Sequence, residues 1–311
     1  MKIFITGGAG FIGSWLVDKL IKENHQVIVI DNLSTGKKEH IHKKAIFYEQ
    51  DITDHEILND IIKKEAPEII FHLAANSLLR KSIDDPLYDA TTNILGTISV
   101  LEACRKNNIK KIMYTSTGGA RVGEPAYLPV DESHPIKPLS PYGISKHSAE
   151  HYVEMYHALY GIDYFIFCFG NVYGPRDSPY TKRLVPVFID KIMKNEKPII
   201  FGDGKQTRDF IYVKDLIDFM IETIPKLGIT PHKLFHLANG KQVSVNEVCE
   251  MLKKISNTSL VFEHTDTVKG EIHDIVLNIS LAKKELQWDP KIPIEEGLTQ
   301  TWNWYKEQYK K

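Results

Sequence analysis

The sequence has few cysteines, few arginines and no long apolar segment. Its 311 residues include three cysteines, Cys104, Cys168 and Cys249, and no CxxC pair. This count excludes a disulfide-stabilised secreted scaffold and a cysteine-ligated zinc domain. No apolar run approaches the roughly 18 residues that a membrane-spanning helix needs, and the apolar start is too short for a signal peptide. We therefore expect a cytoplasmic protein that does not bind membranes.

An excess of charge of either sign is also missing. The 39 basic and 40 acidic residues leave a formal net charge of -1, so the sequence does not predict the positive field that nucleic acid requires. Only six of the basic residues are arginine, so each is a noteworthy candidate for an anion contact. The 42% hydrophobic and 25% charged composition is that of a globular protein. Its length suggests two domains, at about 150 residues each.

The first half of the chain alternates between short apolar runs and helical patterns. Such spacing predicts βαβ units, and continuous apolar strands indicate a parallel sheet covered on both faces. The expected strands are 2–6, 26–30, 45–49, 68–73, 111–115 and 164–169. The expected helices between them are 11–23, 54–64, 89–107 and 142–160. We assign residues 1–170 to a doubly wound α/β domain.

The alternation of strand and helix patterns becomes irregular after residue 170, where segments rich in Pro, Gly and Asp separate the helical patterns. Helices are expected at 184–195, 213–224, 245–255 and 294–306. We assign residues 171–311 to a smaller α/β substrate domain, with part of 205–240 packing back on the first domain.

A glycine-rich turn follows the first strand. Gly7, Gly10 and Gly13 have the spacing that allows a tight turn, close approach of a pyrophosphate and close packing of helix on strand. Asp31 ends the second strand, where a carboxylate binds the adenosine ribose and disfavours a 2′-phosphate. The alternative is a tight turn with an ordinary surface aspartate. The combination predicts a Rossmann-type site for NAD rather than NADP.

Tyr142 and Lys146 lie four residues apart, on one face of the expected helix. A nearby ammonium favours the phenolate form of tyrosine, which can then take a proton from an alcohol. Thr117 or Ser116, at the end of the preceding strand, can supply a hydroxyl between the substrate and Tyr142. Taken alone, YxxxK is also compatible with an ordinary amphipathic helix.

The same helix contains an HxxEH pattern, made by His147, Glu150 and His151. The pattern is found in zinc proteases, because two histidines one turn apart can ligate zinc. Its place within the Tyr142 helix favours ordinary surface or interface histidines, so we predict no metal site.

In this setting the chain resembles the extended short-chain dehydrogenase/reductases, the NAD-dependent nucleotide-sugar epimerase/dehydratase family. The resemblance extends over nearly the whole sequence. It is carried by TGGAGFIG at 6–13, DNLSTG at 31–36, Asp51-Ile52, HLAA at 72–75, NILGT at 93–97, Tyr142/Lys146, NVYGPR at 171–176, GDGKQTRDFIYVKD at 202–215 and WDPKIPIEEGL at 288–298.

The resemblance implies a cofactor site for tightly bound NAD, held as NAD⁺ in the resting state. The residues that it assigns to this site are Gly7, Gly10, Phe11, Ile12, Gly13, Asp31, Asn32, Ser34, Thr35, Gly36, Asp51, Ile52, Leu73, Ala74, Ala75, Asn93, Ser116, Tyr142, Lys146, Phe169 and Val172.

The resemblance also implies a UDP-sugar substrate and a homodimer. The substrate contacts that it implies are Asn171, Arg176, Leu184, Phe201, Arg208 and Lys269. The dimer would form through the helices near 89–107 and 142–160.

The reaction expected from the resemblance is 4-epimerisation of a UDP-hexose, UDP-glucose or UDP-galactose, through a transient 4-keto sugar. Dehydratases and decarboxylases of the family carry an acidic residue just after the catalytic threonine, whereas Gly118-Gly119-Ala120 stand there in this chain. The alternatives are a UDP-N-acetylglucosamine 4-epimerase, another nucleotide-sugar dehydratase, decarboxylase or oxidoreductase, and a non-catalytic NAD-binding protein.

The chain departs from the family pattern at several positions. Gly118 occupies the usual place of the catalytic hydroxyl, so Thr117, or else Ser116, must serve instead. Val122 replaces a tyrosine, and Lys269 stands in the segment where the family usually has an arginine as a second diphosphate contact, so it would substitute as a point charge. Ile275 falls at a position where a bulky residue in some epimerases blocks N-acetyl sugars. The resemblance therefore also allows an N-acetyl sugar as the substrate of this chain.

Overall fold

The computed structural model describes residues 1–230, 233–267 and 272–310. The chain forms two compact units, each assembled from several segments. Unit 1 comprises Met1–Arg121, Pro138–Cys168 and Ile217–Phe235, and unit 2 comprises Val122–Lys137, Phe169–Leu216 and His236–Lys311. The sequence suggested a boundary after residue 170, with part of 205–240 packing back on the first domain; in the structure 217–235 groups with unit 1 and 122–137 with unit 2.

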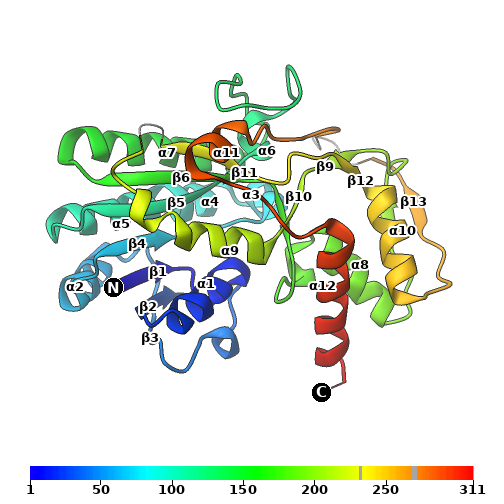
Figure 1. Cartoon of the computed structure of the whole chain (residues 1–311), viewed down its shortest axis with the longest axis horizontal. Coiled ribbons are helices and arrows are strands. Elements are labelled where there is room, and N and C mark those ends of the chain that lie inside the picture. Colours follow the sequence, from blue (N-terminus) through cyan, green and yellow to red (C-terminus); the bar gives the residue numbers. More distant parts are fainter. Residues whose placement is uncertain (231–232, 268–271, 311) are drawn as a thin grey trace. The chain divides into compact units, whose positions relative to one another are not determined.

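A seven-stranded sheet organises unit 1, in the order β11-β6-β5-β4-β1-β2-β3 (Figure 1). Its strands are β1 (Lys2–Thr6), β2 (Gln26–Asp31), β3 (Ile46–Glu49), β4 (Ile69–His72), β5 (Lys111–Thr117), β6 (Asp163–Phe169) and β11 (Leu234–Leu237). Strand β1 is parallel to both of its neighbours, and Ile5 pairs with Val29 on one side and Phe71 on the other. The strand order reverses between β1 and β4, which in such sheets opens a ligand crevice at the carboxyl ends of the strands. The predicted Rossmann-type fold is confirmed.

Helices cover both faces of this sheet. Alternate strand residues such as Phe4, Ile70 and Ile112 share a buried core with three helices, α2 (His55–Glu65), α5 (Gly96–Lys106) and α7 (Pro141–Tyr160). On the other face lie α1 (Phe11–Lys22) and α9 (Val213–Glu222), which cross in front of the strands in Figure 1. The Phe167 ring on β6 lies 6.3 Å from that of Phe219 on α9. Two-sided burial explains why the strands are continuous apolar runs.

The expected helix over 89–107 is present as a continuous helical run, but a π-helical turn interrupts its α-helical pattern. The structure has α4 (Pro86–Ala90), a π-helical turn η2 (Thr91–Leu95) and then α5. The Thr97 hydroxyl donates to the carbonyl of Asn93 at 2.6 Å. A Cβ at Gly96 would lie 2.6 Å from the Ile52 side chain, so this segment packs closely against the turn between β3 and α2. The sequence also gave no sign of the short helix α3 (Leu79–Asp84).

Unit 2 is built from short strands and amphipathic helices around its own core. Strands β7 and β10 pair in parallel, as do β8 and β13, whereas β9 and β12 are antiparallel. These strands are β7 (Asn171–Tyr173), β8 (Ile199–Phe201), β9 (Thr207–Arg208), β10 (Phe210–Tyr212), β12 (Val243–Ser244) and β13 (Glu263–Thr265). The helices are α8 (Leu184–Met193), α10 (Val245–Ser256), α11 (Ser280–Leu286) and α12 (Ile294–Gln308). The described residues also form short helical segments, of which η3 (Pro179–Thr181) belongs to unit 2, η1 (Lys38–His40) and η4 (Ile224–Lys226) belong to unit 1, and α6 (Gly119–Val122) spans the boundary at Arg121.

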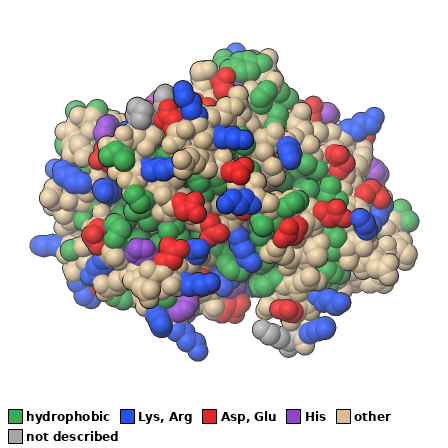
Figure 2. Space-filling model, in the orientation of Figure 1, with side chains coloured by type: hydrophobic (Ala, Val, Ile, Leu, Met, Phe, Trp, Pro, Cys, Tyr) green, Lys and Arg blue, Asp and Glu red, His purple; other side chains and the backbone are tan. Residues whose placement is uncertain are grey.

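The surface carries charges of both signs. On the face drawn in Figure 2, Lys and Arg side chains are interspersed with Asp and Glu side chains. Among the described helices, none is long and apolar enough to cross a membrane.

Candidate active site

The turn after β1 and the helix start behind it have no room for a side chain at Gly7 or Gly13. Gly7 adopts a φ of +74°, and a Cβ there would lie 2.7 Å from the backbone nitrogen of Ala74. A Cβ at Gly13 would lie 2.1 Å from the carbonyl oxygen of Gly7. Phe11 and Ile12 form the first turn of α1, whose N-cap residue Gly10 has no side chain to bond the helix end. This cradle therefore presents backbone N–H groups and the positive end of a helix dipole, which suits a pyrophosphate.

Asp31 is fixed at the end of β2 by two backbone hydrogen bonds. One carboxylate oxygen accepts from the Ala9 N–H at 2.9 Å, and the other accepts from the Leu33 N–H at 2.8 Å. The side chain is buried, and this burial raises the pKa of its carboxyl. Each oxygen keeps a lone pair that a ribose hydroxyl could use. Sequence reasoning predicted a ribose contact for Asp31 but missed that Asp31 also holds the glycine turn.

The other residues predicted to contact adenosine gather at the ends of β2 and β3. The Asn32 side chain donates to Asp51 at 2.6 Å, and the other oxygen of Asp51 accepts from Thr53. Ile52 is buried, whereas Ser34 and Thr35 are exposed on the loop after β2. A Cβ at Gly36 would lie 3.0 Å from the Asp31 carboxylate, which explains the glycine there.

The end of β4 is bonded to the end of β1. The backbone N–H groups of Leu73 and Ala74 donate to the carbonyl and hydroxyl oxygens of Thr6, both at 3.1 Å, and Ala75 follows half-buried. His72 lies between two threonine hydroxyls, 2.7 Å from Thr6 and 3.0 Å from Thr97. Burial, reinforced by the Lys146 charge, lowers the pKa of His72 to about 3. His72 is therefore a neutral part of the structure.

Tyr142 and Lys146 stand on the first two turns of α7. Ser140 caps this helix and Pro141 occupies its first turn, while the Tyr142 N–H donates to the Ser82 hydroxyl at 3.2 Å. The Lys146 side chain is buried, with its Nζ 4.2 Å from the centre of the Tyr114 ring. Burial lowers the pKa of Lys146 to about 7, against the opposing charges of Glu150 and Asp89. An ammonium that titrates near neutrality therefore lies one helical turn from Tyr142.

Asn93, which we predicted to contact the cofactor, is bonded on all sides to the protein. Its side-chain oxygen accepts from the Asn76 N–H at 2.8 Å, and its amide nitrogen lies 3.0 Å from the Ser145 hydroxyl. Ser145, which precedes Lys146, donates to Asp89 at 2.6 Å. This network connects η2 to α7 and holds the helix that carries Lys146.

The two candidate hydroxyls at the end of β5 have different surroundings. Ser116 is buried and donates to the Glu150 carboxylate at 2.5 Å. Thr117 is half-buried, and its oxygen accepts from the Ala120 N–H at 3.3 Å.

The HxxEH residues do not form a metal cluster. His147 lies 2.8 Å from Glu150, whereas His151 is exposed and lies 3.3 Å from Glu154. Among the residues that the structure describes, no group of three His, Cys, Asp or Glu side chains could hold a metal ion.

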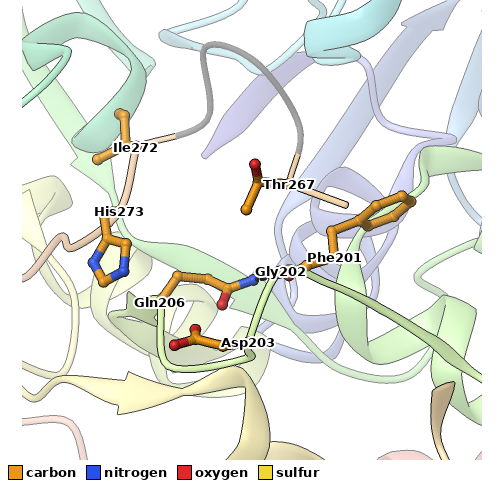
Figure 3. Close-up of a pocket in the computed structure, with 7 residues that line it drawn as sticks. All are labelled: Phe201, Gly202, Asp203, Gln206, Thr267, Ile272 and His273. Atoms are coloured by element: carbon orange, nitrogen blue, oxygen red, sulfur yellow. Dashed lines mark hydrogen bonds between the residues drawn. The ribbon is translucent and has the colours of Figure 1, made fainter. Parts of the chain in front are cut away.

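Unit 2 contains a pocket of about 330 Å³, in which Phe201 lies opposite Ile272 and His273 (Figure 3). The Gln206 amide donates to the Phe201 carbonyl at 2.8 Å, which fixes one wall. Arg208 donates to the carbonyls of Thr207 and His273 at 2.8 and 3.0 Å, so it is tied to the same wall. The lining residues are Phe201, Gly202, Asp203, Gln206, Thr267, Ile272 and His273.

The remaining predicted contacts are spread over unit 2. Asn171 and Val172 form part of β7, directly after Phe169, and Arg176 follows in a left-handed turn with φ of +73°. Leu184 begins α8, and Lys269 lies outside the described residues. Sequence reasoning missed Gln206, Thr267 and His273 as pocket residues, because they come from segments some 60 residues apart and no motif joins them.

Comparisons with known proteins agree with this geometry. The family model of the NAD-dependent epimerase/dehydratase family matches residues 3–233. A Methanocaldococcus jannaschii protein with the provisional name UDP-glucose 4-epimerase is 45% identical over 305 residues, covering 98% of both chains.

Solved structures of high similarity include two epimerases. The Thermotoga maritima UDP-glucose 4-epimerase with UDP-glucose has a TM-score of 0.96 and 38% identity, covering 99% of this chain and 100% of that one. The Methanobrevibacter ruminantium UDP-N-acetylglucosamine 4-epimerase, in complex with UDP-N-acetylmuramic acid, has a TM-score of 0.91 and 34% identity, with 99% and 98% covered. The fold, the glycine cradle and these matches together show that the chain belongs to the NAD-dependent epimerase/dehydratase family.

Proposed function

We propose that this chain is an isomerase that interconverts the 4-epimers of a UDP-hexose, UDP-glucose and UDP-galactose, with bound NAD⁺. The observation that carries the proposal is the position of Tyr142 and Lys146 one turn apart on α7, beside a β5 end followed by Gly118-Gly119-Ala120. An alcohol can be oxidised and re-formed by such a pair, whereas no carboxylate follows Thr117 to expel water or support decarboxylation. The names of the matched epimerases support the same activity.

The NAD contacts fit the cradle of unit 1. Gly7, Gly10 and Gly13 would hold the pyrophosphate, Asp31 and Asn32 the ribose, and Asp51-Ile52 the adenine end. Bound NAD⁺ supplies a reversible hydride acceptor at its nicotinamide ring. Because the reaction regenerates its oxidant, the proposal includes tight retention of the cofactor as NAD⁺.

Three side chains of unit 1 would act on the sugar. Tyr142, as phenolate, takes the proton of the 4-hydroxyl and returns it when the alcohol re-forms. Lys146 stabilises that phenolate by its charge and binds the nicotinamide ribose. The Thr117 hydroxyl orients the 4-oxygen toward Tyr142.

The pocket of unit 2 would bind the nucleoside diphosphate. Phe201 offers an aromatic face and Gln206 an amide, which suit a pyrimidine base. Arg208, whose guanidinium can match paired phosphate oxygens, lies beside it. We assign Asn171, Arg176 and Leu184 to the same substrate on the family resemblance alone.

Replacing Asp31 with Ala is expected to lower NAD retention and to reduce the preference for NAD over NADP. The change removes both the ribose acceptor and the acceptor of the Ala9 N–H. Dissociation constants for the two cofactors, measured on the cofactor-stripped protein, test this. The matched control is Asp18→Ala on α1, and an unchanged ratio of the two constants in Asp31→Ala would contradict the ribose contact.

A UDP-N-acetylhexosamine is the second candidate substrate. Ile275, at the position where larger residues exclude N-acetyl groups, is buried in an apolar cluster of unit 2. One matched structure is a UDP-N-acetylglucosamine 4-epimerase. A panel of UDP- and dTDP-sugars with and without N-acetyl and carboxyl groups distinguishes the two. Faster turnover of UDP-N-acetylglucosamine than of UDP-glucose would make the N-acetyl sugar the first candidate substrate.

We also propose that the protein works in the cytoplasm as a homodimer. Large apolar side chains of α4, η2 and α7 are exposed, with exposed fractions of 80% for Leu87, 55% for Leu95 and 63% for Leu159. All three cysteines are buried free thiols, which suits a reducing compartment. Sedimentation equilibrium tests the dimer, and a monomer at micromolar concentration would contradict it.

A further inference from the structure

Glu150 is a buried carboxylate that the proposed reaction does not use. Its residue exposure is 1%, and it is surrounded by partners from four elements. It accepts the Ser116 hydroxyl from β5 at 2.5 Å, and Arg121 Nη2 from α6 lies 3.2 Å away. The Cys168 thiol of β6 also donates to it, at 3.9 Å. His147 Nδ1, one turn earlier on α7, lies 2.8 Å away. A carboxylate can stay charged in a protein interior only when hydrogen bonds and opposite charges offset its loss of hydration, and these partners do so for Glu150.

The Ser116 contact decides how the two candidate hydroxyls can be used. A hydroxyl has one proton to donate, and Ser116 donates its proton to Glu150. The Thr117 oxygen instead accepts from the Ala120 N–H, which leaves its own proton for another acceptor. Thr117 is also the more exposed of the two side chains.

Glu150 also affects the charge of Lys146. The two residues are four positions apart on α7 and therefore lie on the same face. Both are buried, and the Glu150 carboxylate raises the pKa of Lys146 against the effect of burial. The other groups near this pair are Arg121 on α6, His147 on α7, Tyr114 on β5, Cys168 on β6, Asp89 on α4 and His72 on β4.

We infer that Glu150 is a positioning residue, which holds Ser116 away from the substrate, leaves Thr117 as the hydroxyl for the sugar, and places a carboxylate on the Lys146 face of α7 that favours the ammonium form. Glu150, which belongs to the pattern that resembled a zinc motif, therefore serves the Tyr142–Lys146 pair. The assignment of Thr117 rests on the proposed function, whereas the effect on Lys146 does not.

The charge effect is tested without substrate. The Lys146 titration is followed by NMR on protein with ¹³Cε-labelled lysine, with its signal assigned by its loss in Lys146→Met. Glu150→Gln is expected to lower the Lys146 midpoint by about one pH unit, the smaller end of the range for a close opposite charge. Glu154→Gln is the matched control, because Glu154 also pairs with a histidine three residues earlier on α7 but is exposed. A midpoint that moves equally in both variants, or in neither, overturns the proposal.

The hydroxyl assignment is tested by kinetics on UDP-galactose. Thr117→Ala is expected to lower kcat by about 10²-fold or more, and Ser116→Ala by less than about 10-fold. Both variants keep the Arg121–Glu150 pair, so this test stands if Glu150→Gln does not fold. A larger loss in Ser116→Ala overturns the assignment. A wild-type protein without epimerase activity that still shows the Lys146 shift would refute the proposed function and leave the effect of Glu150 on Lys146 standing.

Discussion

Replacing Tyr142 with Phe is expected to lower kcat for UDP-galactose by about 10³-fold or more, within the upper range for loss of a general acid–base group. The phenolic oxygen is the only atom removed, and no other side chain of unit 1 is assigned to take the proton of the 4-hydroxyl. The ring stays at the second position of α7, whose cap at Ser140 is unaffected. The measurement is steady-state turnover together with the NAD content of the purified protein.

The control for this variant is Tyr152→Phe, which removes a hydroxyl from a more exposed position of the same helix. We expect wild-type turnover in the control and near-normal NAD content in both. Retention of most activity in Tyr142→Phe would show that another group takes the proton.

Replacing Lys146 with Met is expected to lower kcat by about 10²- to 10³-fold, the loss seen when one fixed charge-stabilising donor is removed. Met has a similar length and no charge, so it fills the buried site beside the Tyr114 ring. Without the ammonium, the Tyr142 phenolate is less favoured and more of the enzyme carries a protonated Tyr142. Turnover measured as a function of pH checks this, because the activity that remains should require a higher pH.

The same variant changes how stability depends on pH. Burial lowers the pKa of Lys146 from 10.5 to about 7, so between these values the unfolded chain holds a proton that the native chain has lost. Lys146 therefore makes the native state more stable as pH rises through this window. Urea unfolding at a series of pH values should show a flatter rise in Lys146→Met than in the exposed control Lys106→Met. Equal slopes would mean that Lys146 is not buried as an amine.

The sheet and the cofactor cradle could be predicted because their signals are local. Buried parallel strands are continuous apolar runs, and the close approach of Gly7 to Ala74 and of Gly13 to Gly7 permits only glycine. The Tyr142 and Lys146 spacing is likewise fixed by one helix.

The parts that could not be predicted depend on contacts between distant segments. The role of Glu150 follows from Ser116 and Arg121, which lie 34 and 29 positions away in the chain and reach it only through the fold. The π-helical turn at Thr91–Leu95 places Asn93 against Ser145 of α7. The spacing of apolar residues in the sequence does not indicate this contact. The pocket of unit 2 joins Phe201 to His273, and no sequence motif connects them.

The most direct test of the central claim is incubation of the purified protein with UDP-galactose and no added cofactor. The account predicts that UDP-glucose appears over many turnovers, without net reduction of the cofactor and without release of a keto sugar. Accumulation of a 4-keto product, or turnover that depends on added NAD⁺ in proportion to product, would contradict it.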